Sequence, residues 1–445
     1  MSKIRLHGTS SGYVEIAPAA AASNNTLTAP STVGEIIAKD AAGAIGVTSI
    51  VTTTATITTA KVGAAVTITE SGIEASGIGI TCANITCANI NGGQIGGRRN
   101  LIINGAMQVA QRGTSFTASG GYTLDRWRLD DAMSAGGATI TQSTTSPDGF
   151  SNSLKVDITS ADTSVAAGEY AQFYQYIEAQ NLQHLAYGTS AAKTVTLSFY
   201  VRSNKTGGYN LAILQSDASS RLVSFQYTIN SADTWERKSF TIPGDASGQI
   251  DNDNGIGYSI FWGHAYGTNY TSGSLQSTFS GYSASNFGAG QAVNLYDSTS
   301  NEWYITGIQL ELGSQATPFE HRSYQEELHL CKRYYQQYPE GPHADNYICV
   351  PSAIMACNNT TTAYYCPTLN PTMRSSPSFS HNGNFRMNGT ASVNNVAVTG
   401  IGVYHNGAAT PFQYATVASG LTAGQAVSLS VNNDATAYIS YSSEL

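Results

Sequence analysis

The sequence predicts an all-β protein, and three observations support this fold class. Asp, Glu, Lys and Arg make up only 11% of the 445 residues, against about 25% in average globular proteins, so uncharged residues provide most of the polarity. The chain contains 44 glycines and 26 tyrosines, a composition typical of strands that alternate with tight turns. Short segments of alternating apolar and polar residues recur between Gly, Asn and Ser. The length indicates about three domains.

Charge, hydropathy and cysteine content exclude several classes of protein. The chain carries 21 Lys and Arg against 29 Asp and Glu, a net charge of −8, whereas neutralising phosphates requires clustered cations, so we expect no nucleic-acid partner. No stretch approaches the roughly 20 apolar residues that span a bilayer, so we expect no membrane insertion. Residues 1–18 lack the apolar core of a secretory signal. The six cysteines are too sparse for a disulfide scaffold and are expected to be reduced.

Residues 1–40 are expected to form an N-terminal end region that begins with a small hairpin. Residues 4–6 and 13–16 alternate in polarity, and the segment between them is bounded by Gly8 and Gly12. The rest of this region has the composition of short extended pieces.

Residues 41–97 are a low-complexity segment rich in Thr, Ala and Gly, and we interpret them as a repetitive β-shaft. Isoleucines recur every five residues, with one shift in phase, at Ile68, Ile73, Ile78, Ile80, Ile85, Ile90 and Ile95. Residues 83–92 resemble two pentapeptide repeats, but a single-chain solenoid requires several stacked coils. An intertwined shaft of three chains is therefore favoured over an autonomous solenoid. A flexible linker is the remaining alternative, although linkers need no regular aliphatic positions.

Residues 98–322 are expected to form a jelly-roll β-sandwich, because alternating segments follow one another at the spacing of paired strands. These segments are residues 154–158, 195–201, 211–214, 223–227 and, as the closing strand, 303–312.

A connecting helix is predicted over residues 323–338. Ser323 and Glu326 form a capping box, and Leu328, Cys331 and Tyr335 provide an apolar stripe. Residues 339–445 resume strand patterning and are expected to form a smaller, distal C-terminal β-sandwich, which we interpret as the receptor-binding domain. Its predicted strands are residues 348–354, 363–366, 397–404, 426–431 and 438–441.

Several segments resemble parts of bacteriophage tail-fibre proteins. RNLIINGAMQVAQRGT at residues 99–114 with DRW at 125–127 resembles the start of a module common in these fibres. IQLELG at 308–313, PFEHRSY at 318–324 and LCKRYY at 330–335 are similar to its closing strand and helix. The opening residues 2–6 and 12–15 resemble the N-terminal ends of fibres in phages of aquatic bacteria, cyanophages included.

The resemblance covers nearly the whole chain, and its motifs are structural. It implies a homotrimeric virion protein whose N-terminus binds the phage tail, baseplate or an adaptor protein, and whose other end meets a host surface polysaccharide or lipopolysaccharide. Residues 98–322 are then expected to be similar to a carbohydrate-binding module. Glycan-cleaving tailspikes and head-decorating fibres are the alternative classes.

The sequence contains few signs of catalysis or of a cofactor. We find no phosphate-binding Walker loop, no Gly-x-Ser-x-Gly elbow and no His-Glu-x-x-His pair. We therefore expect no enzyme and no cofactor, although paired carboxylates from distant strands would leave no linear motif. The visible acid clusters are Asp130 with Asp131, and Asp251 with Asp253. Asp251 and Asp253 are also a calcium candidate, but they lack the glutamate of an EF-hand loop, and a plain Asx-rich turn is favoured.

Glycan binding is the chemistry that the composition favours, because sugar rings are recognised by aromatic faces with polar groups nearby. The aromatic residues are densest at residues 258–282, and from this stretch we predict Tyr258, Trp262, Tyr266 and Tyr270 as ligand-binding residues. Strand alternation places Tyr258 and Trp262 on the opposite side from Phe261, so at most one set faces solvent, and core packing is the favoured interpretation.

We predict a second group of ligand-binding residues, His381, Asn384 and His405, in turns of the distal domain, because this domain is expected to meet the host surface first. They are equally well explained as hairpin turns. Together the observations predict a tail fibre that acts outside the cell as part of the virion, where several weak glycan sites on three chains act together.

Overall fold

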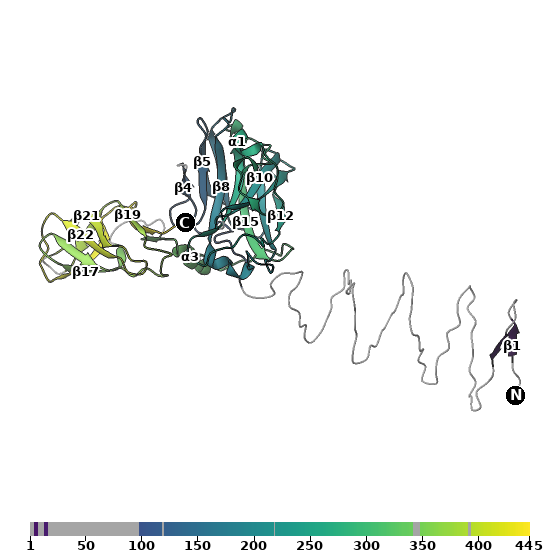
Figure 1. Ribbon diagram of the computed structural model, residues 1–445. Helices are drawn as coiled ribbons and strands as arrows, with labels where there is room; N and C mark the ends of the chain where they lie inside the picture. The colour runs from purple at the N-terminus through teal and green to yellow at the C-terminus, as the bar shows by residue number, and fades with distance from the viewer. Residues whose placement is uncertain are drawn as a thin grey trace, which may run out of the picture. The chain divides into compact units, whose positions relative to one another are not determined.

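The computed structural model describes residues 4–7, 13–16, 98–117, 120–217, 219–340, 348–389 and 393–445, with the side chains of 4–7, 13–16 and 351–353 excepted (Figure 1). Strands dominate, so the predicted all-β class is confirmed. The chain divides into two units, Met1–Asn84 and Ile85–Leu445, each of which is described by itself.

The first unit contains the expected N-terminal hairpin. Strands β1 (Ile4–His7) and β2 (Tyr13–Ile16) pair antiparallel, with Ile4 opposite Ile16 and His7 opposite Tyr13. The repetitive segment 41–97 lies outside the described residues. The β-shaft, its trimeric form and the virion attachment of residues 1–40 therefore stay predictions.

The second unit begins with a sandwich of two antiparallel sheets (Figure 1). Every strand that the sequence predicted for this region is present. The seven-stranded sheet has the order β14 (Ser280–Gly281), β11 (Arg221–Ile229), β10 (Gly207–Gln215), β13 (Ile256–Tyr266), β8 (Tyr170–Glu178), β5 (Arg128–Asp131), β4 (Gly121–Tyr122). The six-stranded sheet has the order β12 (Glu236–Ile242), β9 (Val195–Ser203), β15 (Glu302–Leu312), β7 (Ser153–Ser160), β6 (Gly137–Ser143), β3 (Ser115–Phe116).

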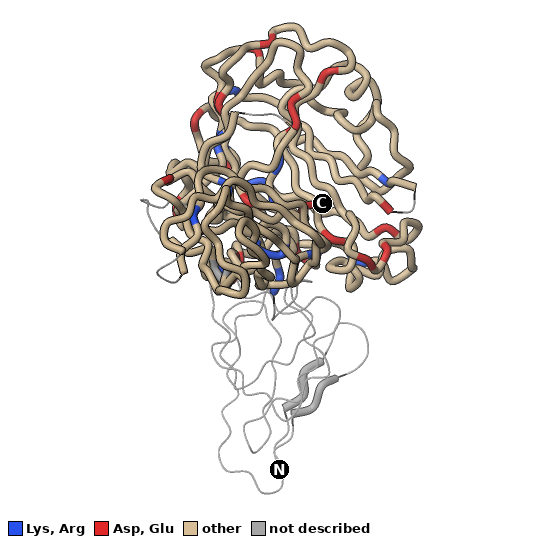
Figure 2. Tube along the Cα trace, turned by 90° about the vertical axis from the view of Figure 1, so that its left-hand side faces the viewer, with Lys and Arg blue, Asp and Glu red and all other residues tan. Residues whose placement is uncertain are grey.

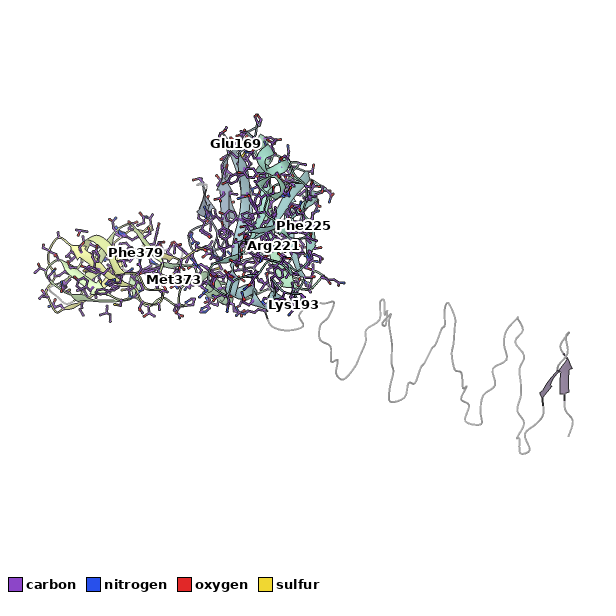
Figure 3. All side chains as sticks on the ribbon, in the orientation of Figure 1. Glu169, Lys193, Arg221, Phe225, Met373 and Phe379 are labelled. Atoms are coloured by element: carbon purple, nitrogen blue, oxygen red, sulfur yellow. The ribbon has the colours of Figure 1, made fainter. Side chains whose placement is uncertain are left out.

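Large aromatic rings fill the space between the two sheets. Trp127, Trp262 and Trp303 are fully buried. Phe173 contacts all three, with ring centroids 4.8, 6.0 and 5.9 Å apart. Short helical turns join the strands at the ends of the sandwich: η1 (Ala179–Leu185), α1 (Thr268–Thr271), α2 (Ala284–Phe287) and η2 (Leu295–Asp297). Figure 3 marks opposite ends of the sandwich with Glu169 and Lys193.

The segments that carry the tail-fibre resemblance contact one another. The Asn100 side chain donates a hydrogen bond from Nδ2 to the Ile308 carbonyl at 3.0 Å and accepts one at Oδ1 from the Leu310 amide at 3.0 Å. The indole of Trp127 donates to the Asn104 carbonyl at 2.9 Å. These motifs therefore hold the start of the domain against its closing strand, which is a structural role.

The predicted helix is shorter than the sequence indicated. Helix α3 spans Tyr324–Lys332, and its capping box is confirmed, because Ser323 Oγ accepts from the Glu326 amide at 3.3 Å and Glu326 Oε2 accepts from the Ser323 amide at 3.3 Å. The prediction of helix to residue 338 is wrong. Residues Tyr335–Tyr338 form strand β16, because they pair with β24 (Tyr438–Ser442) at the far end of the sequence.

The C-terminal region is a closed barrel beside a three-stranded sheet, which corrects the expected two-sheet sandwich. Closure leaves each barrel strand paired on both sides and removes free edges. The barrel order is β17 (Cys349–Cys357), β18 (Thr362–Tyr365), β22 (Phe412–Val417), β21 (Val396–His405), β20 (Phe385–Asn388), β23 (Ala426–Val431). The small sheet has the order β16, β24, β19 (Ser378–Asn382). Phe379 of β19 packs against Tyr441 of β24, with ring centroids 5.7 Å apart (Figure 3).

Candidate functional site

Two of the predicted ligand-binding residues lie in the core. Tyr258 and Trp262 are 0% exposed and belong to the cluster between the two sheets, so their prediction as ligand-binding residues is wrong and the core interpretation holds. The reason is strand alternation on β13, which the sequence did indicate, together with the burial of this central strand. Phe261 points to the opposite side, as expected.

The outer side of the seven-stranded sheet carries a second aromatic cluster, separate from the core. We call it the tyrosine face. Tyr266 and Tyr270, both predicted from the sequence, belong to it. Its rings are those of Tyr170, Tyr174, Tyr176, Phe261, Tyr266, Tyr270 and Phe287.

Tyr266 points to this face because of a β-bulge in β13. The register between β13 and β8 shifts between Gly263 and Ala265, and Tyr266 then pairs with Tyr170. One extra residue in a strand reverses which side the following residues face. His264, the residue within the shift, packs on the buried Trp303 with ring centroids 4.6 Å apart.

Strand β8 supplies most of the tyrosine face. Every second residue from position 170 points outward, and three of these residues, Tyr170, Tyr174 and Tyr176, are tyrosines. Neighbouring outward positions, such as 174 and 176, are about 7 Å apart along the strand. Tyr170 and Tyr176 are partly exposed, whereas Tyr174 is buried between its neighbours. Tyr174 contacts Tyr176 and Phe261, with ring centroids 5.0 Å apart in each pair. This row was not predicted, although its sign in the sequence is that the tyrosines at positions 170, 174 and 176 are separated by even numbers of residues.

Charged groups of β5 and an amide of β8 border the rings. Asp130 accepts hydrogen bonds from the Tyr174 hydroxyl at 2.7 Å and from Arg128 Nε at 3.2 Å. The Arg128 guanidinium lies 5.6 Å from the Tyr174 ring centroid. Gln172 accepts from the Tyr266 hydroxyl at 2.8 Å. Burial and then the bond to Asp130 raise the pKa of Tyr174, so its hydroxyl stays a donor at neutral pH.

The segment after β13 covers the β10 and β11 side of the sheet. Asn210 donates from Nδ2 to the carbonyls of Phe287 and Ala289 at 3.0 and 2.8 Å. The Phe287 ring packs on Phe261 at 5.0 Å. The rings that remain partly exposed therefore lie over β8, and Tyr270 and Tyr282 stand at the edge of the covering segment. Aromatic faces next to a carboxylate, a guanidinium and amides are the groups that recognise sugar rings and their hydroxyls.

The predicted residues of the distal domain are exposed but dispersed. His381 lies on β19 opposite Ile439, and its ring is 5.9 Å from Phe379. Asn384 donates from its amide and from Nδ2 to Asp434, at 2.9 and 3.1 Å, which is the bonding of a turn. His405 ends β21 opposite Phe412.

The calcium candidate takes the form of an Asx turn. Asp253 Oδ1 accepts from the Gly255 amide at 2.8 Å, and the Asp251 amide donates to Asp217 at 3.1 Å. Within the part of the chain that the structure describes, no three His, Cys, Asp or Glu side chains gather in a way that could hold a metal ion. The turn interpretation therefore fits both residues.

Two small depressions lie outside the tyrosine face. One, of about 200 Å³, is lined by residues 110–114, Gln337 and residues 435–438. The other, of about 210 Å³, is lined by Gln325, Leu328, His329, Lys332 and Asn370. Neither includes a residue of the tyrosine face.

Among the described residues, no helix has the length and hydrophobicity that crossing a membrane requires.

Comparison with known proteins finds structural similarity without a sequence family. No protein-family model matches the chain, and no curated protein matches it. The enzymatically active domain of bacteriophage CBA120 tailspike protein 4 aligns at 14% identity and a TM-score of 0.26. The alignment covers 48% of this chain but only 21% of the tailspike structure. The family 22 carbohydrate-binding module of Clostridium thermocellum Xyn10B aligns at 10% identity and a TM-score of 0.25, over 46% of this chain and 98% of the module.

A third similar structure is the family 11 carbohydrate-binding module of Clostridium thermocellum in complex with a β-1,3-1,4-mixed-linked tetrasaccharide. It aligns at 12% identity and a TM-score of 0.24, over 47% of this chain and 98% of the module. At these TM-scores the similarities transfer no residue role to this chain.

Proposed function

We propose that this protein is a bacteriophage tail-fibre protein that attaches the virion to a host surface glycan, and that the tyrosine face of the sandwich binds the glycan. One observation carries the binding part of the proposal: partly exposed Tyr170 and Tyr176 stand in one outward row of β8 beside the Asp130 and Arg128 pair. The fibre part rests on the resemblance of residues 99–114 and 308–335 to tail-fibre modules.

The geometry fits a shallow site for an extended sugar chain. The C–H faces of sugar rings pack on the exposed rings of Tyr170 and Tyr176, and Asp130 and Arg128 bond to hydroxyls at the side. Each such site is weak, and avidity from several chains in one particle makes attachment firm. We therefore expect millimolar single-site affinity and strong binding by intact virions.

Substitution of the outward tyrosines tests the site. Tyr170→Ala and Tyr176→Ala are each expected to weaken binding to host envelope polysaccharide about tenfold, the contribution of one stacked ring. Calorimetry and affinity electrophoresis of the full chain measure the loss. Tyr200→Ala is the matched control, because Tyr200 is partly exposed on β9 of the other sheet and packs on Phe150 at 5.4 Å. Equal loss in the control, or no loss in either variant, contradicts the assignment.

We further propose that the protein binds glycan without cleaving it. Asp130 and Asp131 are adjacent in β5 and therefore point to opposite sides of the sheet. This arrangement does not suit a pair of carboxylates that flank one glycosidic bond. New reducing ends after incubation with host polysaccharide, lost in Asp130→Asn, would establish a depolymerase instead.

Two further measurements test the virion role. A homotrimer is expected from light scattering of the full chain, and a monomeric mass contradicts the intertwined shaft. Electron microscopy of labelled particles distinguishes a tail fibre from a head-decorating fibre.

A further inference from the structure

The outer surface of the barrel carries an exposed cluster of four aromatic rings, which we call the aromatic platform. It consists of Tyr364 on β18, Tyr404 on β21, and Phe412 and Tyr414 on β22. Tyr404 is 51% exposed, and the other three rings are partly exposed. Strand alternation turns these side chains outward, because the neighbouring residues Ala363, Gln413 and Ala415 are fully buried.

The four rings form one continuous surface. Tyr404 lies 5.4 Å from Tyr364, 5.5 Å from Phe412 and 4.8 Å from Tyr414 between ring centroids. The rings of Tyr404 and Phe412 are nearly parallel, at 27°. Gly402 leaves room for the Tyr414 ring, since a Cβ atom at Gly402 would lie 2.5 Å from Tyr414 Cζ.

Hydroxyl and amide groups give the platform hydrogen-bonding capacity. The Tyr364 and Tyr404 hydroxyls are 3.3 Å apart, and Asn358 Nδ2 lies 3.4 Å from the Tyr364 oxygen. Both contacts are long, so these groups can exchange them for bonds to a ligand. The platform therefore combines ring faces with neutral donors and acceptors.

Charge is nearly absent around the platform. Strands β17, β18, β21 and β22 contain no Asp, Glu, Lys or Arg, and residues 348–445 contain only four such residues, Arg374, Arg386, Asp434 and Glu444. Figure 2 shows how sparse Lys, Arg, Asp and Glu are along the described part of the chain. Asp434 bonds to Asn384 and Thr436, and Glu444 pairs with Arg112 and Arg126. A ligand that matches this surface is uncharged, because nothing on it compensates a charge.

The area of the platform fits a small ligand better than a protein partner. Four rings of this exposure present roughly 300 Å², given about 150–250 Å² for a whole aromatic side chain. A stable protein interface needs about 800 Å² on each side.

From these observations we propose that the aromatic platform is a second carbohydrate site, which stacks rings of a neutral sugar and is independent of the tyrosine face. The tyrosine face contains the Arg128 and Asp130 pair, whereas the platform contains no such pair. The strands that carry the platform contain no Asp, Glu, Lys or Arg, so platform binding is expected to be unaffected by salt.

Saturation-transfer NMR of the full chain tests the proposal at pH 8. The probes are a panel of neutral hexose, deoxyhexose and N-acetylhexosamine oligosaccharides, with polygalacturonate as the acidic comparison. At least one neutral probe is expected to receive saturation on its ring C–H protons. Tyr404→Ala should weaken that signal about tenfold, and Tyr404→Phe should retain most of it, because the ring remains.

Matched variants distinguish the platform from the tyrosine face and from a contact between copies of the chain. Tyr324→Ala is the control, since Tyr324 is 52% exposed on α3, and it should leave the signal unchanged. Tyr176→Ala should also leave it unchanged, so failure of the platform and failure of the tyrosine face are distinguishable. The proposal is overturned if no neutral probe gives a Tyr404-dependent signal, or if Tyr404→Ala instead lowers the mass of the protein in light scattering, which would make the platform a contact between copies.

Discussion

The sandwich and the barrel differ in where they place aromatic rings and charges. The sandwich buries Trp127, Trp262 and Trp303 between its sheets. The barrel core consists mainly of aliphatic side chains and methionines, and Tyr404 lies outside it. The sandwich also buries carboxylates that pair with arginine, such as Glu178, which is fully buried and lies 2.7 Å from the partly exposed Arg333. Composition alone therefore does not identify a binding surface, because the sandwich places rings both between its sheets and on the tyrosine face, whereas the ring cluster around Tyr404 lies on the outside of the barrel.

The largest effect on stability is expected from removing a buried ring of the sandwich, compared with removing an exposed ring of the barrel. Trp262→Ala should lower the free energy of unfolding by roughly 3–5 kcal/mol, because it leaves a cavity among the rings of Trp127, Phe173 and Phe199. Tyr404→Ala should change it by about 0.5 kcal/mol or less, as expected for an exposed side chain. Urea unfolding followed by tryptophan fluorescence and by circular dichroism measures both. A similar cost in the two variants would break the comparison.

Loss of a buried ion pair should be almost as costly. The guanidinium of Arg126, whose side chain is 1% exposed, pairs with Glu444 near the end of the chain. Glu444→Ala should cost about 3 kcal/mol, the lower end for a broken buried pair, because Arg126 keeps its hydrogen bond to the Tyr176 carbonyl at 2.7 Å. Arg126→Met/Glu444→Leu removes both charges of this pair and leaves Arg112, the other partner of Glu444, beside Asp125, so the double variant should recover part of the stability. A double variant less stable than Glu444→Ala would contradict this account.

Acid should destabilise the sandwich through His264. Burial lowers the pKa of His264 to about 3, whereas an unfolded histidine has a pKa near 6.5. Between these values the unfolded chain binds a proton that the folded chain does not. This contribution to stability is therefore complete above about pH 6.5 and falls by about 1.4 kcal/mol per pH unit towards pH 3.

The measurement is the free energy of unfolding at a series of pH values, for the protein and for His264→Phe. Phenylalanine keeps an aromatic ring against Trp303 and does not titrate. The variant should have a shallower dependence between pH 6 and pH 4. Identical slopes would show that His264 does not titrate on unfolding.

The smallest effect is expected from an exposed ion pair. Arg202 donates to Asp233 at 2.8 Å, and the Asp233 side chain is 56% exposed. Asp233→Asn keeps a residue that tolerates the positive φ of 56° at this position, so only the charge is removed. The loss should be about 0–1 kcal/mol and should disappear in high salt. A loss of stability as large as that of Glu444→Ala would show that burial does not explain the difference in energy between the two ion pairs.

Local patterns were sufficient for much of the fold. The alternating residues 195–201 and 303–312 lie in β9 and β15, and residues 426–431 coincide with β23. These segments were predictable because residues alternate between the two faces of a strand, and the face of β9 and β15 that packs between the sheets carries the apolar residues. The capping box of Ser323 and Glu326 was predictable because its bonds join residues three apart.

The candidate sites were less predictable. Alternation correctly separated Trp262 from Phe261, but it did not indicate that the Trp262 side is the interior. The row formed by Tyr170 and Tyr176 was missed, because its exposure depends on where the segment after β13 folds back. The platform around Tyr404 was missed because its rings come from three strands that are separate in sequence.

The all-β class, the position of most strands and the start of α3 follow from local sequence, because they depend on residues near one another in the chain. The end of α3 depends on the folded chain, where β16 pairs with β24 after the helix ends at Lys332. It also decided the closure of the barrel and the side on which Tyr266 lies after the β13 bulge. Each of these outcomes depends on hydrogen bonds and burial between segments far apart in sequence, and local propensity does not contain that information.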